Sequence, residues 1–463
     1  MIPRMNEAVK HIPVVMLEEG LQDTPVARQY MDSSKPRSPD LHLWQDENDH
    51  GHLLVVNGSR LFDVAEPLQQ QIQAALDSGN EAQLLSQLGV QGAPMIDDTP
   101  LVQPKTYAFS LAVAQKCNLG CTYCYAQQGE FGGKAQNMPI ETALEAVDLL
   151  LKGVDDGGRF NLAFMGGEPM VNRKVLKAAT LHAVELAEQR NITPSFSITT
   201  NGTLLREQDG EFFEQHGFAV TISLDGVGEM HDSLRPYKNG KGSFDLIMKN
   251  VRPLLAIQQK MQVSARVTVT PKNLQLRPML DSFLAEGFHS VGFSPMLSSP
   301  NGQSQMGQQE LAIMLEQMID CGKAFERQIT AGKRYAFANM NNAMREIDKG
   351  THRPYPCGAG AGYMGVSATG ELSACHRFVD DEAGHMGSLA TGIDSDKQTD
   401  WLEDRHVHQQ EPCNSCWAKY LCGGGCHHEV IGRGRMACDY VRGWLQYCME
   451  AYLRLAPQSD DQP

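Results

Sequence analysis

The sequence predicts an α/β protein built around a partial barrel of six β/α units. Three observations predict it: strand-like and helix-like runs alternate in the middle of the chain, a short three-stranded pattern precedes them, and clustered cysteines follow them. The expected parts are a flexible arm over residues 1–38, a winged-helix domain over 39–95, the partial barrel over 105–310, a helical bridge over 311–350, a cysteine-rich domain over 351–450 and a tail over 451–463.

Composition excludes several classes of protein. The 463 residues exceed what one hydrophobic core usually serves, which predicts two or three domains. A formal charge of -15 argues against a nucleic-acid partner, because phosphate binding needs clustered Lys and Arg. The N-terminus has no apolar signal segment and no run is long enough to span a bilayer, so we expect a cytoplasmic protein without a membrane partner.

The first domain reads as three strands and two helices. "LHLWQ" and "HLLVV" flank the polar "DENDHG" as a hairpin, "RLFDV" supplies a third strand, and "EPLQQQIQAALDSG" and "EAQLLSQLG" have helical periodicity. This is a winged-helix pattern. The alternative of a DNA-reading winged helix is disfavoured by the scarcity of Lys and Arg between residues 41 and 90.

The barrel is predicted from six strand-like runs with helices between them. The runs are "YAFSLAVAQ", "FNLAFMGG", "SFSITTNG", "FAVTISLDG", "VSARVTVTP" and "SVGFSPM". In the helix that starts at Arg173, apolar residues recur three and four positions apart, as packing on a parallel sheet requires. Six units indicate an open barrel rather than the closed eight-stranded form, with the active site at the carboxyl ends of the strands. The loops there carry "CNLGCTYC", "GGEP", "TTNG" and "SLDG".

Three cysteines follow the first barrel strand. Cys117, Cys121 and Cys124 have the spacing C-x3-C-x2-C. Three thiolates satisfy three corners of a cubane iron-sulfur cluster and leave one iron without a protein ligand. The alternative is a zinc site that takes its fourth ligand from elsewhere in the chain.

Seven further cysteines form a second group near the C-terminus. Cys357 and Cys375 precede a C-x2-C-x5-C-x3-C run of Cys413, Cys416, Cys422 and Cys426, and Cys438 follows. In a reducing compartment such clustering indicates metal ligands rather than disulfides. A pair of zinc ribbons is the alternative to iron-sulfur clusters. The two remaining cysteines, Cys321 and Cys448, are expected to be buried small apolar residues on helices.

The first cysteine motif, with the aromatic Tyr123 before its last cysteine, resembles that of the radical S-adenosylmethionine enzymes. The resemblance implies one 4Fe-4S cluster held by Cys117, Cys121 and Cys124, with S-adenosyl-L-methionine bound at the open iron. It also implies a cofactor-binding role for Tyr123 and for a set of residues on the strand-end loops: Gly166, Gly167 and Glu168 at the ammonium group, Ser223 and Arg235 at the ribose and carboxylate, and Met296 near the adenine.

The second cysteine group resembles the SPASM domain of enzymes that modify peptides, which carries two auxiliary 4Fe-4S clusters. The resemblance implies that Cys413, Cys416, Cys422 and Cys438 hold an outer cluster, and that Cys357, Cys375 and Cys426 hold an inner one. Three 4Fe-4S clusters are therefore expected in all. The inner cluster is one thiolate short, so it either recruits another residue or keeps an open site for a substrate thiolate. Cys448 is a spare thiol in a helical segment.

One residue is predicted to act as a base. Asp225 of "SLDG" ends a central strand facing the expected cofactor, so it is a candidate catalytic base for a substrate thiol or backbone proton, and the alternative is an Asx residue that stabilises a turn. Sulfatase-maturating relatives place an aspartate base directly after the equivalent of Cys375. This chain has His376 there.

Within these enzymes the chain resembles those that form thioether bonds, and most closely the maturation enzymes of quinohemoprotein amine dehydrogenase, in segments such as "ARVTVTP" and "THRPYPCGAGAGY". The resemblance implies crosslinks between Cys sulfurs and methylene carbons of Asp or Glu in the dehydrogenase γ subunit, an electron donor such as flavodoxin or ferredoxin, and a precursor-peptide recognition role for residues 39–95. The alternatives are a maturase of short Cys-rich peptides of the sactipeptide or ranthipeptide type, an anaerobic sulfatase-maturating enzyme, and a non-catalytic iron-sulfur escort protein.

Overall fold

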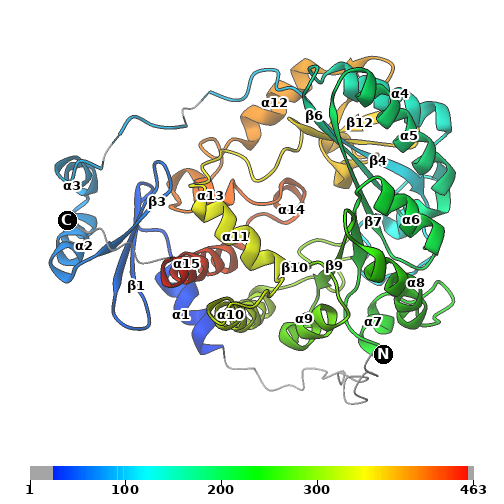
Figure 1. The fold of residues 1–463 in the computed structure, drawn as a ribbon. Helices are drawn as coiled ribbons and strands as arrows, with labels where there is room; N and C mark the ends of the chain where they lie inside the picture. The colour runs from blue at the N-terminus through cyan, green and yellow to red at the C-terminus, as the bar shows by residue number, and fades with distance from the viewer. Residues whose placement is uncertain (1–23, 91, 97–98, 457–463) are drawn as a thin grey trace. The chain divides into compact units, whose positions relative to one another are not determined.

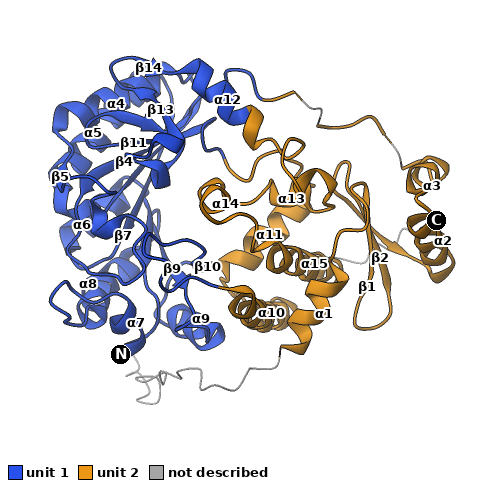
Figure 2. Cartoon of the chain, turned by 180° about the vertical axis from the view of Figure 1, so that it is seen from behind, with its two compact units in different colours: residues 1–20, 101–306, 358–402 blue, residues 21–100, 307–357, 403–463 orange. Residues whose placement is uncertain are grey.

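The computed structural model describes residues 24–90, 92–96 and 99–456, which divide into two compact units (Figure 2). Unit 1 comprises Leu101–Met306 and Gly358–Leu402. Unit 2 comprises the described residues up to Pro100, Gly307–Cys357, and the described residues from Glu403 onward.

Unit 1 is built on the predicted parallel sheet. Its six barrel strands are β4 (Ala108–Gln115), β6 (Arg159–Gly166), β7 (Thr193–Thr200), β8 (Ala219–Ser223), β9 (Gln262–Val269) and β10 (Val291–Pro295). They pair in the order β10-β9-β8-β7-β6-β4, and every neighbouring pair is parallel. The predicted α/β fold with a parallel sheet is therefore confirmed, and the carboxyl ends of all six strands lie at one edge.

Amphipathic helices cover the sheet because each buries one apolar stripe. They are α4 (Ile140–Lys152), α5 (Arg173–Gln189), α6 (Glu207–Gln215), α7 (Glu229–Leu234), α8 (Phe244–Ile257) and α9 (Leu276–Ala285). Figure 1 shows α4, α5, α6 and α8 along the outer face of the strands. On α5, Leu176, Ala179, Ala183 and Ala187 are the predicted stripe and all four are buried.

The sheet continues beyond β4 into the predicted cysteine-rich domain. β11 (Tyr363–Val366) pairs parallel with β4, and β12 (Glu371–Ser373), β13 (His385–Ser388) and β14 (Gly392–Ile393) follow as antiparallel strands. The short β5 (Gln136–Asn137) pairs with the end of β4. The expected domain over residues 351–450 is therefore divided between the two units, because part of it extends the barrel sheet instead of folding separately.

Unit 2 contains the predicted three strands and two helices. β1 (Leu41–Gln45), β2 (Gly51–Val55) and β3 (Arg60–Val64) form an antiparallel sheet, followed by α2 (Glu66–Ser78) and α3 (Glu81–Gln87). One face of the sheet packs on these two helices through Leu41, Leu53, Val55, Val64, Ile72 and Leu85. The pattern of alternating apolar residues thus specifies a small domain with its own core.

Helices make up most of the remainder of unit 2. They are α1 (Pro25–Ser33), α10 (Gln308–Thr330), α11 (Ala338–Asp348), α13 (Lys419–Cys422), α14 (His427–Arg433) and α15 (Cys438–Leu455), and α12 (Ser395–Arg405) runs across the boundary between the two units. Cys321 on α10 and Cys448 on α15 are fully buried, as expected of small apolar residues. None of the described helices has the length and apolar character that crossing a membrane requires.

The predicted boundaries of the N-terminal arm and the C-terminal tail differ from those in the structure. The predicted flexible arm contains helix α1, whose Tyr30 hydroxyl donates to the buried Glu450 carboxylate at 2.5 Å and whose Ala27 amide donates to Glu316 at 2.7 Å. Long-range partners therefore order a segment whose local pattern is weak. The predicted tail begins inside α15, which ends at Leu455; the rest of the arm, residues 1–23, and the rest of the tail, residues 457–463, lie outside the described residues.

The second face of the small sheet carries a buried histidine. His42 on β1 stacks between Trp44, at a ring-centroid distance of 5.1 Å, and Trp417, at 4.2 Å. Its Nε2 lies 3.1 Å from the Gln446 side-chain oxygen on α15. Burial lowers the pKa of His42 to about 4, so the imidazole is neutral at physiological pH.

This histidine predicts a pH-dependent stability. The unfolded chain binds a proton at His42 near pH 6.5, whereas the folded chain does so only near pH 4, so the unfolding free energy of unit 2 should fall as the pH falls through this window. We expect a loss of about 2 kcal/mol between about pH 7.5 and about pH 5. Urea unfolding followed by circular dichroism measures it. His42→Phe should remove this component, while His50→Gln at an exposed position should retain it, and an unchanged slope in His42→Phe contradicts the assignment.

Candidate functional site

The candidate site lies at the carboxyl edge of the parallel sheet in unit 1. Cys117 follows β4, the "GGEP" loop follows β6, "TTNG" ends β7, "SLDG" ends β8 and Met296 follows β10. Since parallel strands bring their carboxyl ends to the same edge, segments that are far apart in the sequence meet there. Every cofactor-binding residue implied by the resemblance lies at this edge or on the loop that follows it.

The three thiols of the first motif are mutual neighbours. Burial raises the pKa of the Cys121 thiol to about 12, the Arg235 guanidinium opposes this shift, and Cys124 and Cys117 add to it. Burial also raises the pKa of Cys117, to which Cys124 contributes. These cysteines are half-buried, and thiols with raised pKa values need a cation to hold them as thiolates, which fits an iron-sulfur cluster. Among the described residues, no group of three or more His, Cys, Asp or Glu is arranged to hold a single metal ion.

Glycines allow the loop after β6 to touch the backbone of the cysteine loop. A Cβ atom on Gly166 would lie 2.3 Å from the Ala114 carbonyl oxygen, and one on Gly167 would lie 2.5 Å from the Lys116 carbonyl group. Gly166 also has a backbone φ of +142°, which residues with a side chain rarely adopt. The Gly167 amide donates to the Ala114 carbonyl at 2.8 Å, so the close approach is fixed by a backbone hydrogen bond.

The Glu168 carboxylate ties two strand-end loops together. It is fully buried and accepts hydrogen bonds from the Thr200 hydroxyl at 2.6 Å, the Asn201 amide at 2.7 Å and the Met170 amide at 3.0 Å. Burial raises the pKa of Glu168, and these three donors oppose the shift. The carboxylate thus links the "GGEP" and "TTNG" loops.

Arg235 presents part of its guanidinium without a protein partner. Its Nη1 donates to the Tyr123 hydroxyl at 2.7 Å and lies 3.3 Å from Asp225 Oδ2. Its Nε is buried and has no hydrogen-bond partner among the described residues. A buried N–H group left in this state costs free energy unless a ligand accepts from it. The side chain is therefore suited to bind an anionic group such as a carboxylate.

Asp225 is fully buried beside Tyr123 and Arg235. Its Oδ2 accepts from the Tyr123 hydroxyl and from Arg235, and its Oδ1 accepts from the Thr268 amide at 2.8 Å. Each oxygen of the predicted base thus already accepts a hydrogen bond from the protein. All three donors belong to other segments of unit 1. The contacts favour a role in positioning Tyr123 and Arg235.

A chain of hydrogen bonds fixes the segment between Asp225 and Arg235. The Asp225 amide donates to His231 Nδ1 at 3.2 Å, His231 Nε2 lies 3.1 Å from the Ser243 hydroxyl, and this hydroxyl donates to the Arg235 carbonyl at 2.7 Å. Burial lowers the pKa of His231 well below its usual value, so the ring is neutral and can accept at Nδ1 while donating at Nε2. The orientation of Arg235 is therefore set from both its side chain and its backbone.

An apolar cluster borders the same edge. Tyr123, Met230, Leu234 and Met296 are buried against one another. The Met296 amide donates to the Val269 carbonyl at 2.7 Å. Ser223 is the last residue of β8 and is half-buried.

Four of the seven C-terminal cysteines meet in unit 2. Burial raises the pKa of Cys413 to about 12, and Cys422, Cys438 and Cys416 all contribute. Burial likewise raises the pKa of Cys422 to about 11, with Cys438 and Cys416 as the next causes. These are the four expected ligands of the outer cluster, and all twelve cysteines of the chain are free thiols.

The three expected ligands of the inner cluster fall in different units. Cys375 belongs to unit 1, while Cys357 and Cys426 belong to unit 2. Within unit 1, the half-buried Tyr125 is a neighbour of both Cys124 and Cys375. Desolvation is the main cause that raises the pKa of Tyr125, and these two thiols add to the shift. His376, next to Cys375, has its Nδ1 2.7 Å from the Tyr363 hydroxyl.

Sequence patterns missed several polar residues of the site. Asn201 donates to the Asn118 side-chain oxygen at 3.0 Å and lies 3.7 Å from the Cys117 sulfur, and the Leu119 amide lies 3.5 Å from that sulfur. The sequence predicts "TTNG" as a strand-end loop. No local pattern, however, distinguishes an Asn that forms a turn from one that, like Asn201, contacts a sulfur. His231 gave no signal either, because its partners are distant in the sequence.

Glu168 provides a test of the loop link. In Glu168→Gln an amide NH2 group replaces a carboxylate oxygen that faces protein donors, so the thermal stability of unit 1 should fall by roughly 1–3 kcal/mol. Differential scanning calorimetry under anaerobic conditions measures this change. Glu207→Gln, at the exposed start of α6, is the matched control and should change stability by less than about 0.5 kcal/mol. Equal effects of the two substitutions would exclude the link.

Part of the chain matches a known protein family. Residues 111–275 match the family model of the Radical SAM superfamily. A serine-type anaerobic sulfatase-maturating enzyme of Klebsiella aerogenes is 24% identical over 349 residues, which cover 71% of this chain and 82% of that protein. An uncharacterized protein of Archaeoglobus fulgidus is 28% identical over 351 residues, covering 72% and 79%.

The fold of this chain is similar to that of solved structures. The structure "Native anSMEcpe with bound AdoMet" superposes with a TM-score of 0.64 at 17% identity, over 75% of this chain and 98% of that chain. Residues 111–275, which match the family model, contain the cysteine triplet and the glycine, glutamate and arginine contacts described above. Residues 111–275 of this chain are therefore a radical SAM domain.

Proposed function

We propose that the protein is a radical S-adenosyl-L-methionine enzyme that forms thioether crosslinks in a peptide or small protein substrate. The γ subunit of quinohemoprotein amine dehydrogenase is the proposed substrate. The observation that carries the proposal is the triplet of neighbouring thiols at the carboxyl edge of the sheet, beside an arginine whose buried Nε has no partner among the described residues. The second set of four neighbouring thiols supports a reaction that needs more than one cluster.

The residues of the edge have complementary roles in this proposal. Cys117, Cys121 and Cys124 would hold a 4Fe-4S cluster, which when bound supplies the electron that cleaves the cofactor to an organic radical. Arg235 would bind the cofactor carboxylate, and Gly166 and Gly167 leave room for its amino group beside the cysteine loop. The Met296 cluster excludes water from the reacting atoms. Asp225 orients Arg235 and Tyr123; its predicted role as the base stays a prediction.

The net reaction explains the proposed auxiliary clusters. Joining a Cys sulfur to a methylene carbon removes one hydrogen from each. The methylene hydrogen would leave as an atom, taken up by the organic radical derived from the cofactor, and the thiol hydrogen would leave as a proton. One surplus electron would then have to be removed for every bridge. Cys413, Cys416, Cys422 and Cys438 would hold an outer cluster, and Cys357, Cys375 and Cys426 an inner one, and these clusters would take up the surplus electron. An external donor such as flavodoxin or ferredoxin would supply the electron that the radical cluster uses.

The small sheet of unit 2 is the proposed site of substrate recognition. β3 is an edge strand and pairs, within the described residues, with β2 alone. An edge with free backbone groups can accept an extended peptide as an added strand. A substrate segment bound there would be held by the enzyme during crosslinking.

Sulfatase maturation is the second candidate function. The relatives from Klebsiella aerogenes and from Clostridium novyi, a cysteine-type enzyme that is 31% identical over 196 residues, favour it. Against it, His376 stands where the resemblance leads one to expect an aspartate base. Formation of formylglycine in a sulfatase-derived peptide would support this candidate over thioether formation.

Mass spectrometry of the co-expressed γ subunit tests the proposal. With the intact enzyme we expect its mass to fall by the two hydrogens that each bridge removes. Cys117→Ala should abolish the change, because the radical cluster loses a ligand. Cys321→Ala, at a buried cysteine outside both groups, is the control and should retain it. Cofactor cleavage without any mass change in the γ subunit would exclude this substrate, and clusters without cofactor cleavage would favour the escort protein.

Arg235→Lys tests the cofactor site separately. An ammonium group is a point charge and cannot hold Tyr123 and Asp225 while also presenting the planar N–H groups of a guanidinium. We expect S-adenosyl-L-methionine to bind roughly tenfold or more weakly, measured by equilibrium dialysis and by the change it causes in the electron paramagnetic resonance spectrum of the reduced cluster. Arg252→Lys, on the outer helix α8, should bind as the unchanged protein does. Equal affinities in the two variants would remove Arg235 from the site.

A further inference from the structure

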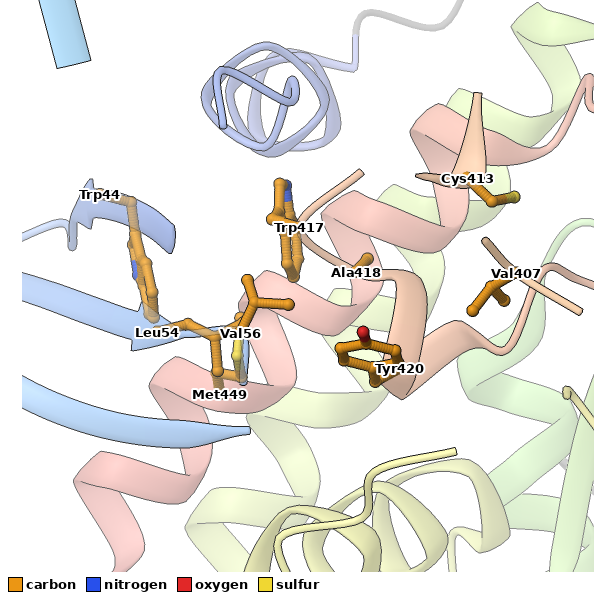
Figure 3. Close-up of a cluster of buried hydrophobic side chains, with 9 residues drawn as sticks. All are labelled: Trp44, Leu54, Val56, Val407, Cys413, Trp417, Ala418, Tyr420 and Met449. Atoms are coloured by element: carbon orange, nitrogen blue, oxygen red, sulfur yellow. The ribbon is translucent and has the colours of Figure 1, made fainter. Parts of the chain in front are cut away.

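The small sheet of unit 2, which we call the recognition sheet, shares one hydrophobic core with residues 407–426, which we call the cysteine segment. Figure 3 shows Trp44, Leu54 and Val56 of the sheet region facing Trp417, Ala418 and Tyr420, with Met449 of α15 beside them. Cys413 is a buried member of this core, and Cys416 and Cys422 pack against it. We call the buried members of this cluster the shared core: Trp44, Leu54, Val56, Val407, Cys413, Trp417, Ala418, Tyr420 and Met449. Three of the four proposed outer-cluster ligands therefore touch the same apolar cluster as the proposed recognition sheet.

Ring stacking adds a specific contact to the shared core. Trp417, the residue after Cys416, is nearly parallel to His42 of β1, at an interplanar angle of 4°, and only 1% of its surface is exposed. Its indole N–H donates to the Ser34 carbonyl at 2.7 Å. The position of Trp417 thus fixes His42 and, through the second stack, Trp44 on the same strand.

The cysteine segment has little regular structure to hold it in place. Between Val407 and Cys426 its helices are the three-residue turn Cys413–Ser415 and the four-residue α13. Helices this short are not stable by themselves, because nucleation costs more than a few hydrogen bonds return. A cluster bound to four thiolates would crosslink the segment to the start of α15 and would bind only when the segment is folded.

We infer that the outer cluster holds the recognition sheet in its peptide-binding form, so that loss of this cluster abolishes substrate recognition as well as electron transfer. The inference rests on the proposed function. A cluster that binds only the folded cysteine segment stabilises that segment. Because the sheet packs on the segment through the shared core, the same binding also stabilises this face of the sheet. Peptide recognition thus depends on cluster loading, and a chain without the outer cluster does not engage substrate.

Cys438→Ala is the sharpest test, because this ligand lies outside the shared core. The full-length protein is reconstituted anaerobically, and its iron content, its affinity for the labelled γ subunit by fluorescence anisotropy, and its amide hydrogen exchange over residues 41–64 are measured. We expect about four fewer irons per chain. The affinity should fall roughly tenfold or more, and exchange in β1 and β2 should rise.

Cys121→Ala is the matched control, since it removes a ligand of the radical cluster in unit 1. It should lose iron while retaining γ-subunit affinity and slow exchange in the sheet. Trp417→Leu should resemble Cys438→Ala in exchange. Lost iron with unchanged affinity and exchange in Cys438→Ala would overturn the inference, and so would unchanged iron. If the intact protein does not bind the γ subunit, the substrate proposal fails, while the exchange comparison still decides the inference.

Discussion

The site depends on a contact between two backbones. The loop after β6 lies so close to the end of β4 that any side chain at Gly166 or Gly167 would collide with main-chain atoms of residues 114–116. This contact fixes the position of the "GGEP" loop relative to Cys117. Glu168 of that loop then accepts hydrogen bonds from Thr200 and Asn201, which fixes the end of β7 to the same loop. The thiol triplet, the glutamate and the end of β7 form one rigid arrangement because each is fixed to its neighbour.

The features predicted from sequence were those with a local or periodic signature. The parallel sheet follows from repeated strand and helix runs, and the cysteine groups follow from their spacing. The small domain of unit 2 followed from alternating apolar residues and a turn. In each case the residues that carry the signal are close together in the chain, so no knowledge of the tertiary structure was needed.

The features that were missed depend on partners distant in sequence. Helix α1 is held by Glu316 and Glu450, which lie hundreds of residues away, so its segment looked like an arm. Residues 358–402 joined the barrel sheet because β11 pairs with β4, and strand pairing across such a separation leaves no local trace. Asp225 was predicted as a base from its place at a strand end, but its contacts with Tyr123, Arg235 and Thr268 could be found only in three dimensions.

Helix α15 joins two features of unit 2 by its geometry. Cys438 is its first residue, and Gln446 and Met449, which face the small sheet, lie eight and eleven positions later on the same helix. An α-helix advances about 1.5 Å and turns about 100° per residue, so the thiol and the sheet contacts are separated by roughly 12–17 Å at a fixed rotation. Insertion or deletion of a single residue between positions 438 and 446 would swing the thiol to another side of the helix, so the length of this stretch is constrained even where its individual side chains can vary.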